Sequence, residues 1–370
     1  MCLDPLSAQQ GLDRFEALAN SKLLQYNPLK SCFVILGKTK ARIELEEKFS
    51  QNPPLLYGQP LAVNHKGTYL GDELSKSVSE SISLTIKKRI GLTKRAIFEI
   101  KRIVEDVRSK AVGGILSGVL LWTSSVLPYL LGNCSTWFCM KKSDLDQLSK
   151  LQNLFLNVLL GVQHCPVPLM MWDLKLLLIP LRILKSKLLL YQHISHLSDS
   201  DISHRVLVQQ QRLQLPGLYE DVSRFLNKYE VIDIQSFSKS EWSRFVNSKI
   251  ESENRDYLFE RSKYYKKLDY LSLGCEDYEV KPYFHKLNLA QSRIKFWERS
   301  KTLKYCRTSH PSEESNLKVS MRCFECEKVD LLSHWSSCSG YAHLRKSKNL
   351  DDDFDLTNYY SEIIKLRVVY

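Results

Sequence analysis

The sequence is poor in glycine and proline, with 14 and 12 of these residues among 370 positions. Disordered chains are enriched in such residues, so their scarcity, together with abundant Leu, Ile and Val, predicts globular structure. The chain opens without a secretory signal, because residues 1–5 have neither a basic start nor an apolar run. Internal repeats and low-complexity linkers are also missing. The length allows roughly two domains of about 100–200 residues each.

Familiar catalytic motifs are missing as well. The sequence contains no GxxxxGK[ST], GxSxG or HExxH pattern, which argues against the enzyme classes that those patterns mark. Cys165 follows His164, but adjacent residues do not form a nucleophile–base pair without a third group to orient them. Most of the ten cysteines are scattered, and we expect these to be reduced core residues.

Positive charge is the first functional indication that is present. Lys and Arg total 53 against 41 for Asp and Glu, a formal net charge of +12. An excess of this size suits a polyanionic partner, because each cation placed near a phosphate releases a condensed counterion. The charge favours a nucleic-acid partner, and the alternative is a basic soluble protein that binds no nucleic acid.

Residues 111–140 carry no charged side chain, and 112–131 are long enough to span a bilayer. The same stretch contains three glycines, several hydroxyl residues and Pro128, all of which weaken a membrane-insertion signal. We therefore expect a buried helix that stops before Pro128, and no membrane partner.

Hydrophobic periodicity predicts a mainly α fold with a small β element. Helices are expected over 4–24 and 39–49, with short strands at 31–37, 55–57, 61–64 and 68–71. From Ser77 onward, isoleucines and valines recur at helical spacing with basic residues between them. Further helices are expected over 112–131, 143–160 and 173–198.

Aromatic and basic residues alternate within 240–307. Cations attract phosphates and aromatic faces stack on unpaired bases, so this stretch is a candidate nucleic-acid-binding region. An amphipathic helix with buried rings and outward lysines explains the pattern equally well, and nearby acidic residues are compatible with that alternative. The candidate binding residues are Arg261, Lys263, Lys266, Lys267, Arg293 and Lys295.

Near the end of the chain, Cys323-x-x-Cys326 is followed by His334-x-x-x-Cys338. Zinc prefers four N or S ligands in a tetrahedron, and these two pairs can supply them, which predicts a closed structural Zn²⁺ site. The alternative is four unligated residues, with thiols in the core. Trp335 lies between the ligands and could stack on a base, while Arg345 adds positive charge.

Several segments together resemble the C-terminal part of non-LTR (LINE-type) retrotransposon reverse transcriptases. Residues 27–31 (NPLKS), followed by 34–37 (VILG), resemble a palm strand of that family. Residues 69–72 (YLGD) resemble its primer-supporting segment, and 127–133 (LPYLLGN) with Trp137 resemble a thumb helix. Residues 323–345 resemble its C-terminal Cys-Cys-His-Cys knuckle.

The resemblance implies an order of regions along the chain: an incomplete end of the palm at 1–75, a helical thumb at 76–200, a helical basic and aromatic connector at 201–310, and a zinc-knuckle-like module with a C-terminal helix at 311–370. It also places Lys30 near the phosphates of an incoming nucleotide. The paired aspartates that hold Mg²⁺ in the family do not precede Asn27, and the acidic run 351–353 lacks flanking apolar strands.

Three hypotheses follow. The first is a nucleic-acid-binding reverse transcriptase fragment that does not polymerise alone and uses no catalytic residue of its own. In the second, the chain belongs to an active polymerase whose palm and fingers lie upstream or on another chain, and which would supply the Mg²⁺ site. The third is a zinc-stabilised helical module that binds proteins. The family's behaviour implies an intracellular location, in the nucleus, the cytoplasm or both.

Overall fold

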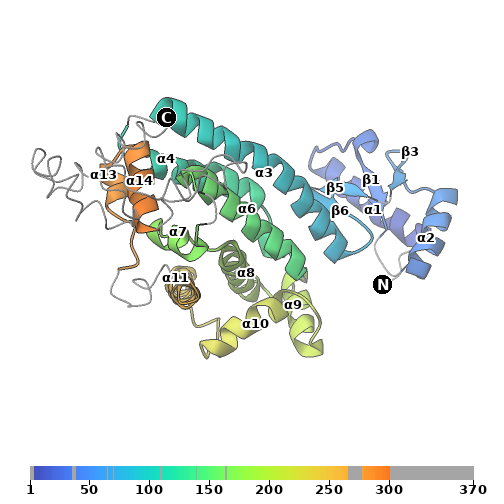
Figure 1. Ribbon diagram of the computed structural model, residues 1–370. Coiled ribbons are helices and arrows are strands. Elements are labelled where there is room, and N and C mark those ends of the chain that lie inside the picture. The colour runs from blue at the N-terminus through green and yellow to red at the C-terminus, as the bar shows by residue number, and fades with distance from the viewer. Residues whose placement is uncertain are drawn as a thin grey trace, which may run out of the picture. The chain divides into compact units, whose positions relative to one another are not determined.

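The computed structural model describes residues 4–35, 39–64, 66–69, 71–108, 111–138, 140–162, 165–265 and 277–300 (Figure 1). These residues form a mainly helical protein with small β elements, which confirms the predicted fold class. They group into two units. Unit 1 comprises Met1–Gly91, Asn133–Asp146 and Leu190–Gln235. Unit 2 comprises Leu92–Gly132, Gln147–Leu189 and the described part of Ser236–Tyr370.

Unit 1 begins with helix α1 (Pro5–Ser21), which the Asp4 side chain caps by accepting from the Ser7 amide at 2.8 Å. A short 3₁₀ helix, η1 (Pro28–Lys30), leads into strand β1 (Cys32–Val34). Helix α2 (Thr39–Gln51) follows, as the sequence predicts. A small core forms between these elements from Ala8, Ile35 and Phe49, with Phe33, Leu45 and Val63 against it.

The strands of unit 1 are short and pair in twos. Strand β1 is parallel to β4 (Ala62–Asn64), with Phe33 opposite Val63. Strands β2 (Leu55–Leu56) and β3 (Gln59–Pro60) form one antiparallel hairpin. Strands β5 (Gly67–Tyr69) and β6 (Asp72–Leu74) form another, with Tyr69 opposite Asp72. Tyr69, Gly71 and Asp72 of the YLGD segment therefore lie at the end of this hairpin, where Gly71 supplies a φ of +85°.

The helical remainder of unit 1 includes α9 (Ile202–Leu213) and α10 (Leu218–Lys228), which pack against each other. Three helices have residues in both units: α3 (Val78–Arg108), α6 (Lys142–Leu160) and α8 (Ile179–Ser195). The predicted helix over 173–198 is thus shorter. It is preceded by a separate helix, α7 (Val167–Asp173).

The uncharged stretch contains α4 (Gly114–Leu121), a π-helical turn η2 (Trp122–Val126) and α5 (Leu127–Leu130). The expectation that this helix stops before Pro128 was wrong. The π turn widens the backbone immediately before the proline and leaves room for a residue that has no N–H, so the helix continues. Trp122 in this turn is fully buried and stacks on Phe155 of α6, with ring centroids 4.4 Å apart.

Unit 2 is completed by α11 (Lys239–Ser262), α13 (Tyr283–Lys286) and α14 (Leu289–Arg299). Ser238 and Glu241 form a reciprocal capping box that fixes the start of α11. Helix α11 packs on α7, while α13 and α14 pack on α4. The indole of Trp242 is buried and donates to the Leu188 carbonyl at 2.9 Å. None of the described helices combines the length and hydropathy needed to cross a bilayer.

Candidate nucleic-acid interface

Helix α3 carries the most regular run of exposed positive charge among the described residues. Its 31 residues span about 46 Å at 1.5 Å per residue. Exposed cations come in pairs separated by seven positions, which is two helical turns, so they lie along one face. These six residues are Lys87, Lys88, Lys94, Arg95, Lys101 and Arg102, and we call them the α3 basic face.

The opposite side of α3 is apolar and explains the orientation of the helix. Ile86, Ile97, Ile100 and Val104 are each at most 5% exposed. Burying these side chains fixes which face the cations present. The exposed side also carries apolar groups, including Phe98, which is 54% exposed. Aromatic rings and positively charged groups are the side chains with which proteins contact nucleic acids.

Half of the α3 basic face is engaged by carboxylates. Lys88 pairs with Glu73, Lys101 lies 3.8 Å from Glu105, and Arg102 lies 2.8 Å from Glu99. Such exposed pairs contribute little energy and are readily exchanged for another anion. Lys87, Lys94 and Arg95 have no carboxylate partner within the described part of the chain. These three cations are therefore available to phosphates.

Within unit 1, two of the segments that carry the family resemblance are joined directly. Asp72, in YLGD, accepts from the Asn133 amide at 3.1 Å, across 61 positions of sequence. It also accepts from the Arg89 guanidinium at 2.7 Å. Arg89 lies over the Trp137 ring, 5.5 Å from its centroid. This arrangement holds the β5–β6 turn against the residues that follow α5.

The residues predicted from the sequence lie in several places. Lys30 is exposed at the end of η1 in unit 1. Arg261 and Lys263 are exposed at the end of α11 in unit 2. Arg261 lies 5.8 Å from the Tyr264 ring centroid, and Lys263 pairs with Glu260 at 2.6 Å. Lys266 and Lys267 lie outside the described residues.

Arg293 and Lys295 lie on α14 and are half-buried. The Arg293 guanidinium donates to the Leu159 carbonyl at 3.0 Å and to Glu105 at 2.9 Å. These contacts tie α14 to the end of α6 and to α3, and they account for the position of Arg293 without a bound phosphate. The amphipathic-helix alternative therefore describes α14 well: Phe296 is fully buried there.

A buried ion pair that the sequence does not reveal lies at the other end of the same helix. Asp173 is completely buried, and Arg299 donates to both of its carboxylate oxygens, at 2.8 and 3.1 Å. The Tyr283 hydroxyl donates to it as well, at 3.0 Å. Burial raises the pKa of Asp173 to about 6, although Arg299 opposes that shift. Arg299 thus binds a carboxylate in the interior of unit 2.

The predicted zinc ligands Cys323, Cys326, His334 and Cys338 lie outside the described residues, as do Trp335 and Arg345. In the part of the chain that the structure describes, no group of three or more His, Cys, Asp or Glu residues is placed to hold a metal ion. The zinc site stays a prediction.

The α3 basic face was not among the candidates predicted from the sequence, because aromatic–basic alternation favours 240–307. A signal for it exists in the sequence: KK, KR and KR recur at 87, 94 and 101. Comparison with protein-family models, with curated proteins and with solved structures finds no match to this chain.

Proposed function

We propose that this chain is the nucleic-acid-binding C-terminal part of a non-LTR retrotransposon reverse transcriptase, and that it binds RNA or DNA without polymerising alone. The observation that carries the proposal is the α3 basic face, with Lys87, Lys94 and Arg95 unpaired among the described residues. Along this helix the cation pairs recur about every 10 Å, so several of them can contact phosphates of one bound nucleic acid.

The motif segments support the family assignment. NPLKS leads through η1 into strand β1, YLGD forms the β5–β6 turn, and LPYLLGN forms α5 and the residues after it. In the proposal, unit 1 holds the end of the palm, and the helix that follows it begins the thumb. The bond between Asp72 and Asn133 would then link primer support to thumb.

An incomplete palm also explains the small β elements. Parallel strands are normally buried inside larger sheets, yet β1 pairs with β4 alone among the described strands. Several apolar side chains nearby are largely exposed, including Leu23 at 96% and Leu29 at 90%. In the proposal, the partner that would cover them is a polymerase segment that carries the paired aspartates and Mg²⁺.

A filter-binding titration across salt concentrations tests the proposal. With single- and double-stranded RNA and DNA, the logarithm of the affinity should fall linearly with the logarithm of salt concentration, because bound cations displace counterions. Affinity that does not change with salt would contradict it and would favour the protein-binding module. The coding DNA upstream of Met1 tests the polymerase alternative: an in-frame strand with paired aspartates supports it, and a stop codon removes it.

A further inference from the structure

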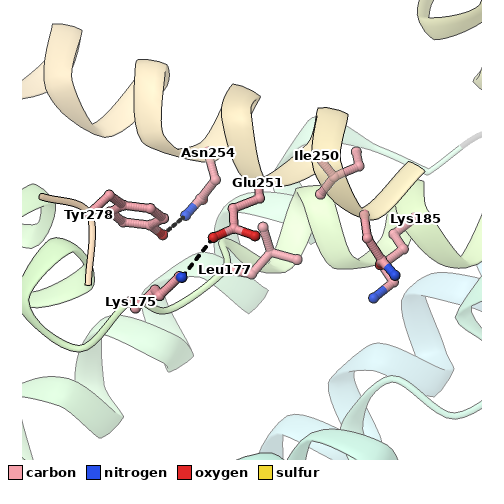
Figure 2. Close-up of a pocket in the computed structure, with 8 residues that line it drawn as sticks. Lys175, Leu177, Lys185, Ile250, Glu251, Asn254 and Tyr278 are labelled. Atoms are coloured by element: carbon pink, nitrogen blue, oxygen red, sulfur yellow. Dashed lines mark hydrogen bonds and ion pairs between the residues drawn. The ribbon is translucent and has the colours of Figure 1, made fainter. Parts of the chain in front are cut away.

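A cavity of about 310 Å³ lies within unit 2, between α11 and the segment that joins α7 to α8. Figure 2 shows Lys185 at one end and Lys175 with Tyr278 at the other, with Ile250 and Glu251 of α11 between them. The volume is at the small end of the range for ligand pockets, which suits one small organic molecule.

The floor of this cavity is a buried loop whose backbone is held by two side chains. Asn254, fully buried on α11, donates to the Leu176 carbonyl at 2.9 Å and accepts from the Leu178 amide at 3.1 Å. Gln152 donates to the Leu177 carbonyl at 3.0 Å and accepts from the Ile179 amide at 3.1 Å. With its polar groups satisfied, this loop is fixed, and the pocket is largely preformed.

The two ends of the pocket differ in charge. Lys175 is neutralised by Glu251 at 2.9 Å and Glu279 at 2.8 Å, which leaves a carboxylate excess at that end. At the other end Lys185 of α8 lines the pocket and has no carboxylate partner within the described residues. Arg182, one turn earlier on α8, is not one of the lining residues, and its guanidinium donates to the Leu177 carbonyl at 3.3 Å. Burial and the charge of Arg182 lower the pKa of Lys185. A cation without a counter-ion attracts an anion.

Leu177 and Ile250 give the pocket apolar surface, and the Tyr278 ring adds an aromatic face at the Lys175 end. The Tyr278 hydroxyl accepts from the Asn254 amide at 2.5 Å, so the ring is held in place. A ligand that fits has an anion at one end, a planar apolar body, and N–H donors that can reach Glu251 at the other end.

We propose that this pocket binds a nucleoside 5′-phosphate, with the phosphate at Lys185 and the base beside Leu177, Ile250 and Tyr278, its amino group toward Glu251. The site uses none of the cations of the α3 basic face and goes beyond the proposed function. The nucleotide could be free or could be one unit of a bound strand.

Isothermal titration of the full chain with adenosine 5′-monophosphate tests the site. One molecule should bind per chain, whereas adenosine and inorganic phosphate should each bind at least about tenfold more weakly, since each lacks one half of the contacts. Lys185→Gln should weaken binding of the nucleotide by about tenfold, and Lys185→Arg should restore it. Lys150→Gln, which removes an exposed charge on α6, is the matched control and should have no effect.

A single-stranded oligonucleotide then distinguishes the two sources. If it displaces the mononucleotide, the occupant is a unit of a strand, and if it does not, the occupant is a free nucleotide; both outcomes retain the pocket. Absence of saturation at millimolar nucleotide, or equal binding by the Lys185→Gln and Lys150→Gln chains, would overturn it. Duplex binding through α3 should persist in Lys185→Gln, so the proposal for the pocket and the proposed function fail separately.

Discussion

Arg299 donates to Asp173 at 2.8 Å across 126 positions of sequence, and this carboxylate is completely buried. The pair connects the end of α7 to the last described helix, and Tyr283 of α13 binds the same carboxylate. Breaking one side of a buried pair leaves the other charge without compensation, whereas the intact pair adds little net stability. The arrangement fixes how these helices meet within unit 2.

The first prediction concerns the pH dependence of stability. The pKa of Asp173 is raised to about 6 from 3.8, so the folded state holds this proton more tightly than the unfolded state. Its contribution to stability is greatest below pH 3.8 and is lost as the pH rises through 6. The free energy of unfolding of the parent minus that of Asp173→Asn should therefore decrease across this range.

Urea unfolding of both chains at several pH values measures that difference. A difference that increases with pH would mean that attraction to Arg299 outweighs burial. The sign of the slope thus decides between the two causes that act on this carboxylate.

A second prediction compares two helical glycines. A Cβ at Gly118 would lie 2.4 Å from Leu159 Cδ1 and 3.3 Å from Val104 Cγ2, both in the core of unit 2. Gly118→Ala should therefore lower the free energy of unfolding by roughly 1–3 kcal/mol through overpacking. A Cβ at Gly91 on α3 would meet no described atom within 4 Å.

Gly91→Ala is the matched control and should raise the free energy of unfolding by roughly 0.5–1 kcal/mol, because alanine favours the helix. Thermal unfolding of both variants checks the pair. Similar changes in the free energy of unfolding at the two positions would show that α4 does not approach Leu159 closely.

The third prediction concerns the loop beneath the pocket. Asn254→Ala removes the partners of the Leu176 carbonyl and the Leu178 amide and should destabilise the chain by about 2–4 kcal/mol. Asn247→Ala, two turns earlier on the same helix and exposed, should change stability by less than about 0.5 kcal/mol. Equal denaturant midpoints for the two variants would contradict the conclusion that Asn254 stabilises this loop.

A fourth prediction assigns the salt dependence of nucleic-acid binding to α3. Replacing Lys87, Lys94 and Arg95 with glutamine should reduce the slope of log affinity against log salt by roughly two to three, since each lost phosphate contact lowers it by about one. A chain with the exposed Lys141, Lys142 and Lys150 replaced by glutamine loses the same number of charges and serves as the control. A slope equally reduced in both chains would show only a loss of general positive charge.

Local patterns in the sequence predicted much of the fold. Isoleucines at helical spacing identified α3, because an amphipathic pattern of that length has no other compact arrangement. Short strands around 32–34 and 62–64 were expected, but their parallel pairing was not, since pairing depends on residues far apart in sequence. The prediction that the helix ends before Pro128 was wrong because the π turn before the proline changes the register of the backbone hydrogen bonds.

The candidate sites were harder to predict. The alternation of cations and rings predicted that Arg293 binds nucleic acid. In the structure its guanidinium binds the Leu159 carbonyl and Glu105. Spacing cannot reveal that contact, because its partners are more than a hundred residues away. The pocket could not be predicted either, since Lys185 and Glu251 line the same cavity only when α8 and α11 pack in the folded chain. Pairs of cations seven apart, by contrast, were readable from the sequence alone.

The interleaving of the two units has a practical consequence. Each unit collects separate stretches of chain, and the borders fall inside α3, α6 and α8. A single break anywhere in the polypeptide therefore cannot release either unit with all of its parts. Removing one stretch should therefore destabilise both units, which favours cooperative unfolding over stepwise unfolding of separate modules.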